Sequence, residues 1–172
     1  MNLSYKICDL EDLQVLVEIS VNTFISAFEK QNDPEDFKVY MATAFSKEQI
    51  KKELLDENTS FYLVYNEKDL VGYFKLNEKE AQTEPLGKAS IEIERIYVLD
   101  EFQGQNIGQK MLLKTIEIAK EKRLTFIWLG VWENNTAAIR FYERHGFEKF
   151  DTHPYYIGND KQTDWLMRLD LV

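Results

Sequence analysis

The amino-acid sequence predicts a mixed α/β sandwich around one sheet. The first observation is the order of periodic segments along the 172 residues, which reads β-α-α-β-β-β-α-β-α-β-β. The second is the nearly continuous apolar run FIWLGVW at 126–132, which is typical of a strand covered on both faces. The third is the aromatic content of 13%, which fits a mixed sheet better than a helical bundle. We therefore expect one domain over residues 1–172, with a core of its own.

The first segments read as a strand followed by helices. LSYKI at 3–7 alternates as a strand does, and Asp9 is placed to cap a helix over about 10–28. That helix carries an apolar stripe at three- and four-residue steps, formed by Leu13, Leu16, Val17, Ser20, Phe24 and Phe28. Asn32 and Asp33 before Pro34 predict a turn and a new helix start. Ser46 and Gln49 form a capping-box pattern, which opens a helix that ends at about Asp56.

The middle of the chain predicts a hairpin, a strand and a helix. FYLVY at 61–65 and LVGYFKL at 70–76 are separated by NEKD, as two hairpin strands are. The polar residues 77–89 read as an exposed connection. IEIERIYVL at 91–99 predicts the next strand, and a helix is expected over about 108–122. Its buried stripe is formed by Met111, Leu112, Thr115, Ile116 and Ala119.

The last third predicts one helix and two further strands. After the strand at 126–132, TAAIRFYERH predicts a helix that stops at Gly146, a residue well suited to end a helix. GFEKF at 146–150 predicts a strand, THPYYIGNDKQ at 152–162 a loop, and TDWLMRLDL at 163–171 the last strand.

Charge and composition exclude several classes of function. The net charge of −9 argues against a nucleic-acid partner, because phosphate binding needs a basic surface. An acidic surface is compatible with a cationic substrate, although most such surfaces only confer solubility. Cys8 is the single cysteine and the chain has two histidines, so we expect neither a disulfide nor a metal site. The N-terminus shows no secretion signal and no apolar run has transmembrane length, so we expect a cytoplasmic chain without a membrane partner.

The stretch FQGQNIGQK at 102–110 joins the strand at 91–99 to a helix and is a candidate anion site. The first N–H groups of a helix lack partners within the helix and lie at the positive end of its dipole, which suits a diphosphate. Gly104 and Gly108 would let the backbone approach a ligand closely. The stretch is neither a Walker motif nor a GxGxxG fingerprint. Taken alone, an ordinary strand-to-helix turn explains it equally well.

Two motifs together resemble the GNAT N-acetyltransferases. Gln103, Asn106 and Gly108 match the Q/R-x-x-G-x-G/A loop of that family, with asparagine where the family usually has glycine. Asparagine tolerates the left-handed conformation better than most residues. After the following strand comes the pattern N-x-x-A-x-x-F-Y-x-x-x-G-F, formed here by Asn135, Ala138, Phe141, Tyr142, Gly146 and Phe147. A closer similarity is to the Pai-type spermidine/spermine N-acetyltransferases of Gram-positive bacteria, and it is carried by the segments IEIERIYV, IWLGVWE, FYERHGF and HPYYIGNDKQTD. The segment QNDPEDFKVYMATAF near the N-terminus is similar too, so the likeness covers essentially the whole chain.

The resemblance implies a fold, a cofactor and a reaction. The implied fold is a mixed, largely antiparallel sheet of about seven strands with helices on both faces. The implied reaction moves the acetyl group of acetyl-CoA to a primary amine of a small cationic acceptor such as spermidine or spermine, by direct transfer in a ternary complex. Acetylation of protein α-amines or lysines stays open as an alternative, as does a non-catalytic acyl-CoA-binding module. Homodimer formation is left open as well.

The resemblance also assigns roles to residues. Tyr142 matches the tyrosine that lies by the thioester sulfur and acts as general acid; a core tyrosine is the alternative. Glu92 and Glu94 share one face of their strand, where carboxylates are costly unless solvated or functional. By the resemblance, Glu92 matches the position of the family's glutamate base and Glu94 is the alternative, and either could instead hold the amine. His153 is a candidate acceptor-site residue by likeness alone. The implied cofactor contacts are Ile96, Tyr97 and Val98 along the pantetheine arm, Asn135, Ala138 and Tyr142 on the later helix, and Gln103, Gly104, Gln105, Asn106, Ile107, Gly108, Gln109 and Lys110 around the pyrophosphate.

Overall fold

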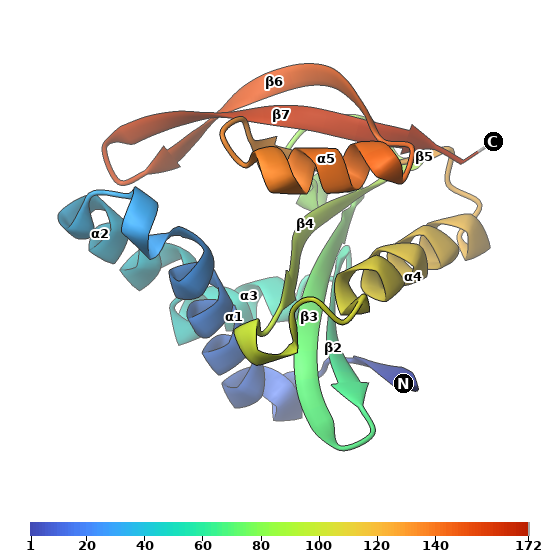
Figure 1. Ribbon diagram of the computed structural model, residues 1–172, viewed down its shortest axis with the longest axis horizontal. Coiled ribbons are helices and arrows are strands. Elements are labelled where there is room, and N and C mark those ends of the chain that lie inside the picture. The colour runs from blue at the N-terminus through green and yellow to red at the C-terminus, as the bar shows by residue number, and fades with distance from the viewer. Residues whose placement is uncertain (172) are drawn as a thin grey trace.

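Seven strands form one sheet in the order β1-β2-β3-β4-β5-β7-β6 in the computed structural model, which describes residues 1–171 (Figure 1). The strands are β1 (Leu3–Ile7), β2 (Thr59–Asn66), β3 (Asp69–Glu78), β4 (Ser90–Val98), β5 (Phe126–Trp132), β6 (Glu148–Ile157) and β7 (Asp160–Asp170). Neighbouring strands are antiparallel except β4 and β5, which are parallel. The predicted mixed, largely antiparallel sheet is therefore confirmed.

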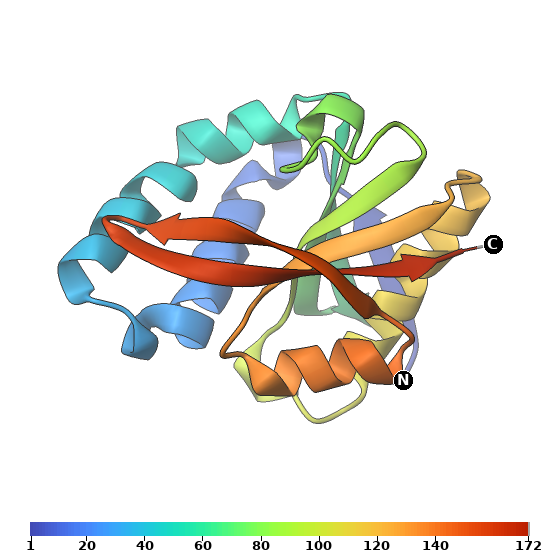
Figure 2. The same cartoon turned by 90° about the horizontal axis from the view of Figure 1, so that it is seen from above.

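Five α-helices cover the two faces of this sheet (Figure 2). They are α1 (Leu13–Phe28), α2 (Pro34–Ala44), α3 (Lys47–Leu54), α4 (Ile107–Glu121) and α5 (Thr136–Arg144). Three of them lie between β1 and β2, where the predicted element order contains two. The helix start predicted at Pro34 is confirmed, and the helix that it opens is separate from the one that Ser46 caps. Among the helices of residues 1–171, none has the length and apolar character that a membrane crossing requires.

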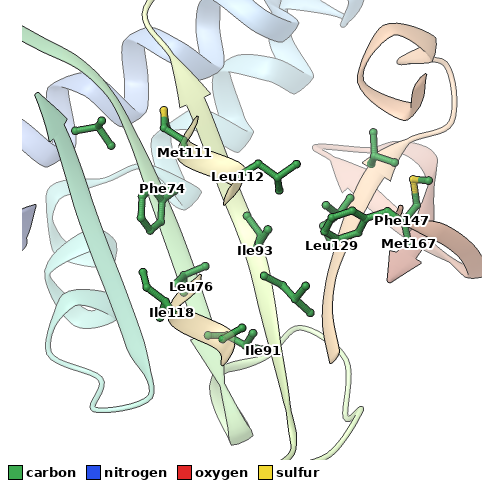
Figure 3. Close-up of a cluster of buried hydrophobic side chains, with 14 of the residues drawn as sticks. Phe74, Leu76, Ile91, Ile93, Met111, Leu112, Ile118, Leu129, Phe147 and Met167 are labelled. Atoms are coloured by element: carbon green, nitrogen blue, oxygen red, sulfur yellow. The ribbon is translucent and has the colours of Figure 1, made fainter. Parts of the chain in front are cut away.

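Two hydrophobic clusters hold the helices on the sheet. One lies between the sheet and helices α4 and α5, and Figure 3 shows its centre, where Met111 and Leu112 of α4 meet Phe74 of β3 and Ile93 of β4. The other packs α1, α2 and α3 on the opposite face and is rich in aromatic rings, with Phe24 of α1 stacked on Phe37 of α2. Both faces are thus covered, which explains the nearly continuous apolar run in β5.

Side-chain caps begin the first helices at the predicted residues. The Asp9 carboxylate accepts the backbone N–H of Glu11, and Asp12 reciprocates by accepting the N–H of Asp9 at 3.1 Å. Asp9 opens a short 3₁₀ turn that leads directly into α1. The Ser46 hydroxyl accepts the N–H of Gln49 at 3.1 Å. The second contact of the predicted capping box, from the Gln49 side chain back to Ser46, was wrong, because the Gln49 side-chain amide donates to Glu53 instead.

The C-terminal hairpin corrects the loop expected at 152–162. Those residues form most of β6 and the start of β7, and the chain turns at Gly158, whose φ of 59° is left-handed. Pro154 does not interrupt β6, because proline is compatible with an edge strand and β6 is an edge of this sheet. The tip of the hairpin rests on α2, where the N–H of Asn159 donates to Asp36 Oδ1 at 3.1 Å.

The connection between β3 and β4 is anchored rather than exposed throughout, which corrects the prediction for 77–89. Three consecutive residues bind three different strands. Gln82 accepts the indole N–H of Trp128 in β5 at 2.7 Å. The N–H of Thr83 donates to Glu92 in β4 at 2.8 Å, and Glu84 accepts from Nδ1 of His153 in β6 at 2.9 Å.

Candidate active site

Strands β4 and β5 are paired only at their beginnings. Their parallel ladder runs from Ser90 beside Phe126 to Glu92 beside Trp128. Beyond this point β4 stays paired with β3 as far as Val98, while β5 stays paired with β7 as far as Trp132. The two strands therefore separate towards their C-terminal ends, and their facing backbone edges carry groups that no ladder between them uses.

A cavity of about 770 Å³ occupies this part of the molecule. Its walls come from the end of α1, the separated halves of β4 and β5, the start of α4, one side of α5 and the β6–β7 hairpin. The predicted residues in its lining are Glu94, Ile96, Tyr97, Val98, Gln103, Gly108, Asn135, Ala138 and Tyr142. The structure thus brings most of the expected site residues together in one cavity.

The loop before α4 has the backbone that an anion site needs. Gly104 and Asn106 are both left-handed, with φ of 76° and 61°, so Asn106 adopts the turn conformation where the family usually has glycine. Gln103 is fastened by its side-chain amide, which donates to the carbonyl of Val98 at 3.2 Å. Helix α4 starts at Ile107, and its first N–H groups lie beside the cavity wall at Gly108. The loop can therefore present backbone donors and the positive end of a helix dipole to a phosphate.

The remaining predicted loop residues lie elsewhere. Ile107 is 1% exposed and packs in the core, so only its backbone could meet a ligand. The side chains of Gln105, Gln109 and Lys110 are exposed, and Lys110 lies near the N-terminus, within 3.5 Å of the carbonyl of Met1.

Helix α5 presents Tyr142 to the cavity. Asn135 caps the helix by accepting the N–H of Ala138 at 3.2 Å, which fixes its first turn at the cavity wall. The Tyr142 ring packs against Phe141 and Phe147, with ring centroids 5.3 Å and 5.7 Å away. Burial raises the pKa of Tyr142 to about 12, so the phenol keeps its proton at neutral pH. The residue is a packed tyrosine with its ring at the cavity, which suits a proton donor.

A β-bulge places Glu94 in the cavity. Lys75 of β3 is paired with Arg95, but Leu76 is paired with Ile93, so Glu94 is an extra residue in β4. Its carboxylate forms an ion pair with Lys75 and accepts the amide of Asn77 at 2.7 Å. Burial raises the pKa of Glu94, but Lys75 and Arg95 outweigh burial and bring it below its ordinary value. Glu94 is therefore an anion at neutral pH.

Glu92 lies on the same side of β4, as predicted, but is absent from the cavity lining in the described chain. Asn77 bridges the two carboxylates, since its amide also donates to Glu92 at 3.2 Å. Glu92 is 3% exposed and binds the connection between β3 and β4 through Thr83. Burial raises the pKa of Glu92, and the charge of Glu94 raises it further. In this geometry Glu92 anchors the connection between β3 and β4, while Glu94 lines the cavity.

His153 lies behind the cavity rather than in its lining. Its Nδ1 donates to Glu84 at 2.9 Å, and its Nε2 is 3.5 Å from Oδ2 of Asp164, which does line the cavity. Hydrogen bonding to Asp164, followed by that to Glu84, raises the pKa of His153 despite its partial burial.

Sequence reasoning missed the cavity residues from α1 and from the C-terminal hairpin. These are chiefly Phe24, Phe28, Tyr155, Gln162 and Asp164. For the hairpin, the missed signal was the spacing of Gln162, Asp164 and Leu166, which places two polar side chains in line with a core residue on one face of a strand.

Comparison with known proteins agrees with this geometry. Residues 21–147 match the acetyltransferase (GNAT) family. An uncharacterized N-acetyltransferase in the pepI 3' region of Lactobacillus delbrueckii subsp. lactis is 33% identical over 162 residues, with 94% of each chain covered. The spermine/spermidine N(1)-acetyltransferase of Bacillus subtilis is 33% identical over 86 residues, which cover 49% of this chain and 57% of that protein.

A solved structure shows the same fold. The PaiA N-acetyltransferase of Thermoplasma acidophilum, in complex with coenzyme A, has a TM-score of 0.78 at 21% identity, with 99% of both chains covered. The cavity between the separated strands agrees with the family match and with the N-acetyltransferase relative that spans nearly the whole chain. The chain therefore belongs to the acetyltransferase (GNAT) family and is an N-acetyltransferase that uses acetyl-CoA.

Proposed function

We propose that the protein acetylates a primary amine of a polyamine by direct transfer from acetyl-CoA in a ternary complex. The observation that carries this proposal is that Tyr142 of α5 and Glu94 of β4 line the same cavity. The cavity lies where β4 and β5 separate and leave room for an elongated cofactor. The partial likeness to a spermine/spermidine N(1)-acetyltransferase supports the acceptor class. The acidic chain, with a net charge of −9, is compatible with a cationic acceptor.

The separated edge of β4 and the loop before α4 are proposed to hold acetyl-CoA. Backbone groups of Ile96, Tyr97 and Val98 would bind the pantetheine arm in the manner of an added strand. The first N–H groups of α4, with Gly104, Asn106 and Gly108 shaping the turn, would bind the pyrophosphate. When bound, acetyl-CoA supplies the acetyl group as a thioester.

Tyr142 and Glu94 are proposed to manage the protons. Tyr142 holds a proton on Oη at neutral pH and can donate it where negative charge develops on the leaving sulfur. Glu94 is an anion whose lowered pKa makes it better suited to hold the acceptor's ammonium group than to keep a proton. We therefore propose that Glu94 orients the acceptor's amine, and that the proton lost by the ammonium group passes through Glu94 to solvent. Glu92 is proposed to support Glu94 through Asn77, without touching the amine.

The test is acetyl-CoA turnover with a panel of spermidine, spermine, n-butylamine, and peptides with a free α-amine or a lysine. We expect the highest kcat/KM with a polyamine. Faster acetylation of the peptides than of either polyamine would show that the acceptor class is wrong and that protein acetylation is the activity. Mass spectrometry of the product would identify the nitrogen that is acetylated.

A further inference from the structure

Among residues 1–171, the carboxylates that line the cavity are Glu94, Asp100 and Asp164, and they differ in how their charge is balanced. Glu94 contacts Lys75 and Arg95, and Glu53 contacts the same two cations, so these four groups sum to zero charge. Asp100 lies next to the loop before α4 and accepts hydrogen bonds from Ser26 and Gln103. Within the part of the chain that the structure describes, Asp164 faces one charged partner, His153, which it shares with Glu84.

The cluster formed by Glu84, His153 and Asp164, termed here the hairpin cluster, therefore keeps negative charge. Two carboxylates flank one imidazole, so the cluster carries one net negative charge when His153 is protonated and two when it is neutral. The side chains of His153 and Asp164 are 15% and 13% exposed. Charge in so confined a place is screened less by salt than charge on an open surface.

The backbone around the hairpin cluster is shaped for close contact. His153 and Asp164 are directly paired across β6 and β7, so their side chains share a face of the sheet. Gly130 of β5 lies beneath them, where a Cβ would come within 3.3 Å of Asp164 Oδ2 and 3.4 Å of His153 Nε2. Glycine at this position thus gives both side chains room against the cavity wall.

We infer that Asp164, positioned by His153 and Glu84, binds an ammonium group of the acceptor that does not react. The inference rests on the proposed function, because only an acceptor with two or more amines has such a group. Glu94 and Asp164 come from β4 and β7, on either side of β5, so one elongated diamine-like chain could meet both. Asp164 is then a specificity-determining residue: it distinguishes polyamines from monoamines and leaves the transfer step itself to other groups.

The experiment compares Asp164→Asn with wild type at saturating acetyl-CoA, with spermidine and n-butylamine as acceptors. The substitution keeps the shape and removes the charge. We expect KM for spermidine to rise about tenfold or more, the range measured for loss of one member of a confined charge pair. KM for n-butylamine should change by no more than about twofold, since that acceptor has no second ammonium. Asp170→Asn is the matched control, because Asp170 is on the same strand, 64% exposed and outside the cavity lining of the described chain.

A second variant covers the case in which Asp164→Asn does not fold, as judged by circular dichroism. Glu84→Gln removes charge from the hairpin cluster without altering the cavity wall. It should raise KM for spermidine about threefold and lower the pKa of His153 measured by NMR. An equal change for both amines, or no change for either, in whichever variant folds would overturn the role of Asp164. Absence of polyamine turnover by the wild type would instead overturn the proposed acceptor class.

Discussion

Single side chains beside the cavity show why buried charge is tolerated here. Lys75 and Arg95 are 4% and 8% exposed, and a buried cation without a partner is strongly destabilising. Each contacts both Glu53 and Glu94, so the cost of burial is offset by two anions rather than one. The consequence for chemistry is that Glu94 is held in place and ionised before any substrate arrives.

The role of Tyr142 can be separated from its packing. Tyr142→Phe removes the proton donor and keeps the ring, so the contacts with Phe141 and Phe147 should survive. We expect kcat at saturating acetyl-CoA to fall by about tenfold to several hundredfold, with little change in melting temperature. Tyr156→Phe on β6 is the control, because that tyrosine is 55% exposed. Turnover close to wild type would show that Tyr142 is only a packing residue.

Glu92 and Glu94 should respond differently to the same substitution. Glu94→Gln removes the anion in the cavity, and we expect kcat/KM for spermidine to fall about tenfold or more. Glu92→Gln weakens the hydrogen bonds that Thr83 and Asn77 donate to the Glu92 carboxylate, so we expect a lower melting temperature. We expect kcat/KM for spermidine to change by no more than about threefold. Thermal melting and steady-state kinetics on both variants test the assignment. The opposite pattern would make Glu92 the carboxylate that acts on the amine.

The raised pKa of His153 predicts a specific dependence of stability on pH. A folded-state pKa above the ordinary 6.5 means that the proton is bound more tightly in the folded chain. This stabilisation is complete below pH 6.5 and is lost as the pH rises through the raised pKa. Urea unfolding of wild type and His153→Gln from pH 5.5 to 8.5 measures it, and the wild-type advantage should shrink as the pH rises. In an Asp164→Asn background the pH dependence should weaken, because Asp164 is the largest cause of the shift. A difference independent of pH would contradict this account.

At the scale of elements, helix α4 and the loop before it make the clearest case for a test. Gly108 has ordinary space around it, since the nearest atom to an added Cβ would be Val98 Cγ2 at 3.8 Å. An aspartate in the first turn also suits the helix dipole, so a Gly108→Asp variant should fold. The same carboxylate would repel a phosphate at that position.

We therefore expect Gly108→Asp to weaken acetyl-CoA binding by about tenfold or more, which corresponds to roughly 1.4 kcal/mol. Isothermal titration calorimetry measures the affinity directly. Gly108→Ala adds the Cβ without the charge and should stay within about threefold of wild type. Unchanged affinity in a folded Gly108→Asp variant would mean that the pyrophosphate does not lie at the start of α4.

Elements with strong local signals were predictable from the sequence, and those that depend on distant contacts were not. Asp9, Asp33 and Ser46 cap helices by local hydrogen bonds, so their positions could be read directly. The long β6–β7 hairpin could not, because Pro154 is acceptable only on an edge strand, and strand order is a property of the whole sheet. The bulge at Glu94 and the approach of Asp164 to His153 depend on the register in which the strands pair, and no local sequence pattern indicates that register.

At the scale of the whole molecule, the net charge of −9 should act in opposite directions on the two substrates. A polyamine is attracted to the acidic protein, whereas acetyl-CoA is itself anionic and is repelled by the same field. We expect KM for spermidine to rise between 50 and 500 mM NaCl, and KM for acetyl-CoA to stay level or fall, because salt screens both effects. KM for n-butylamine, a monovalent acceptor, should rise less than that for spermidine. Parallel changes for both amines would show that the charge of the chain does not select the acceptor.

The three consecutive anchors at Gln82, Thr83 and Glu84 have a consequence for recombination with related enzymes. Each residue binds a different strand, so inserting or deleting one residue before them would misplace all three partners at once. A chimera that transplants only the C-terminal hairpin would leave His153 facing a foreign connection without Glu84. Residues 77–92, Trp128 and residues 148–170 therefore share one set of contacts and should be moved between homologous scaffolds together.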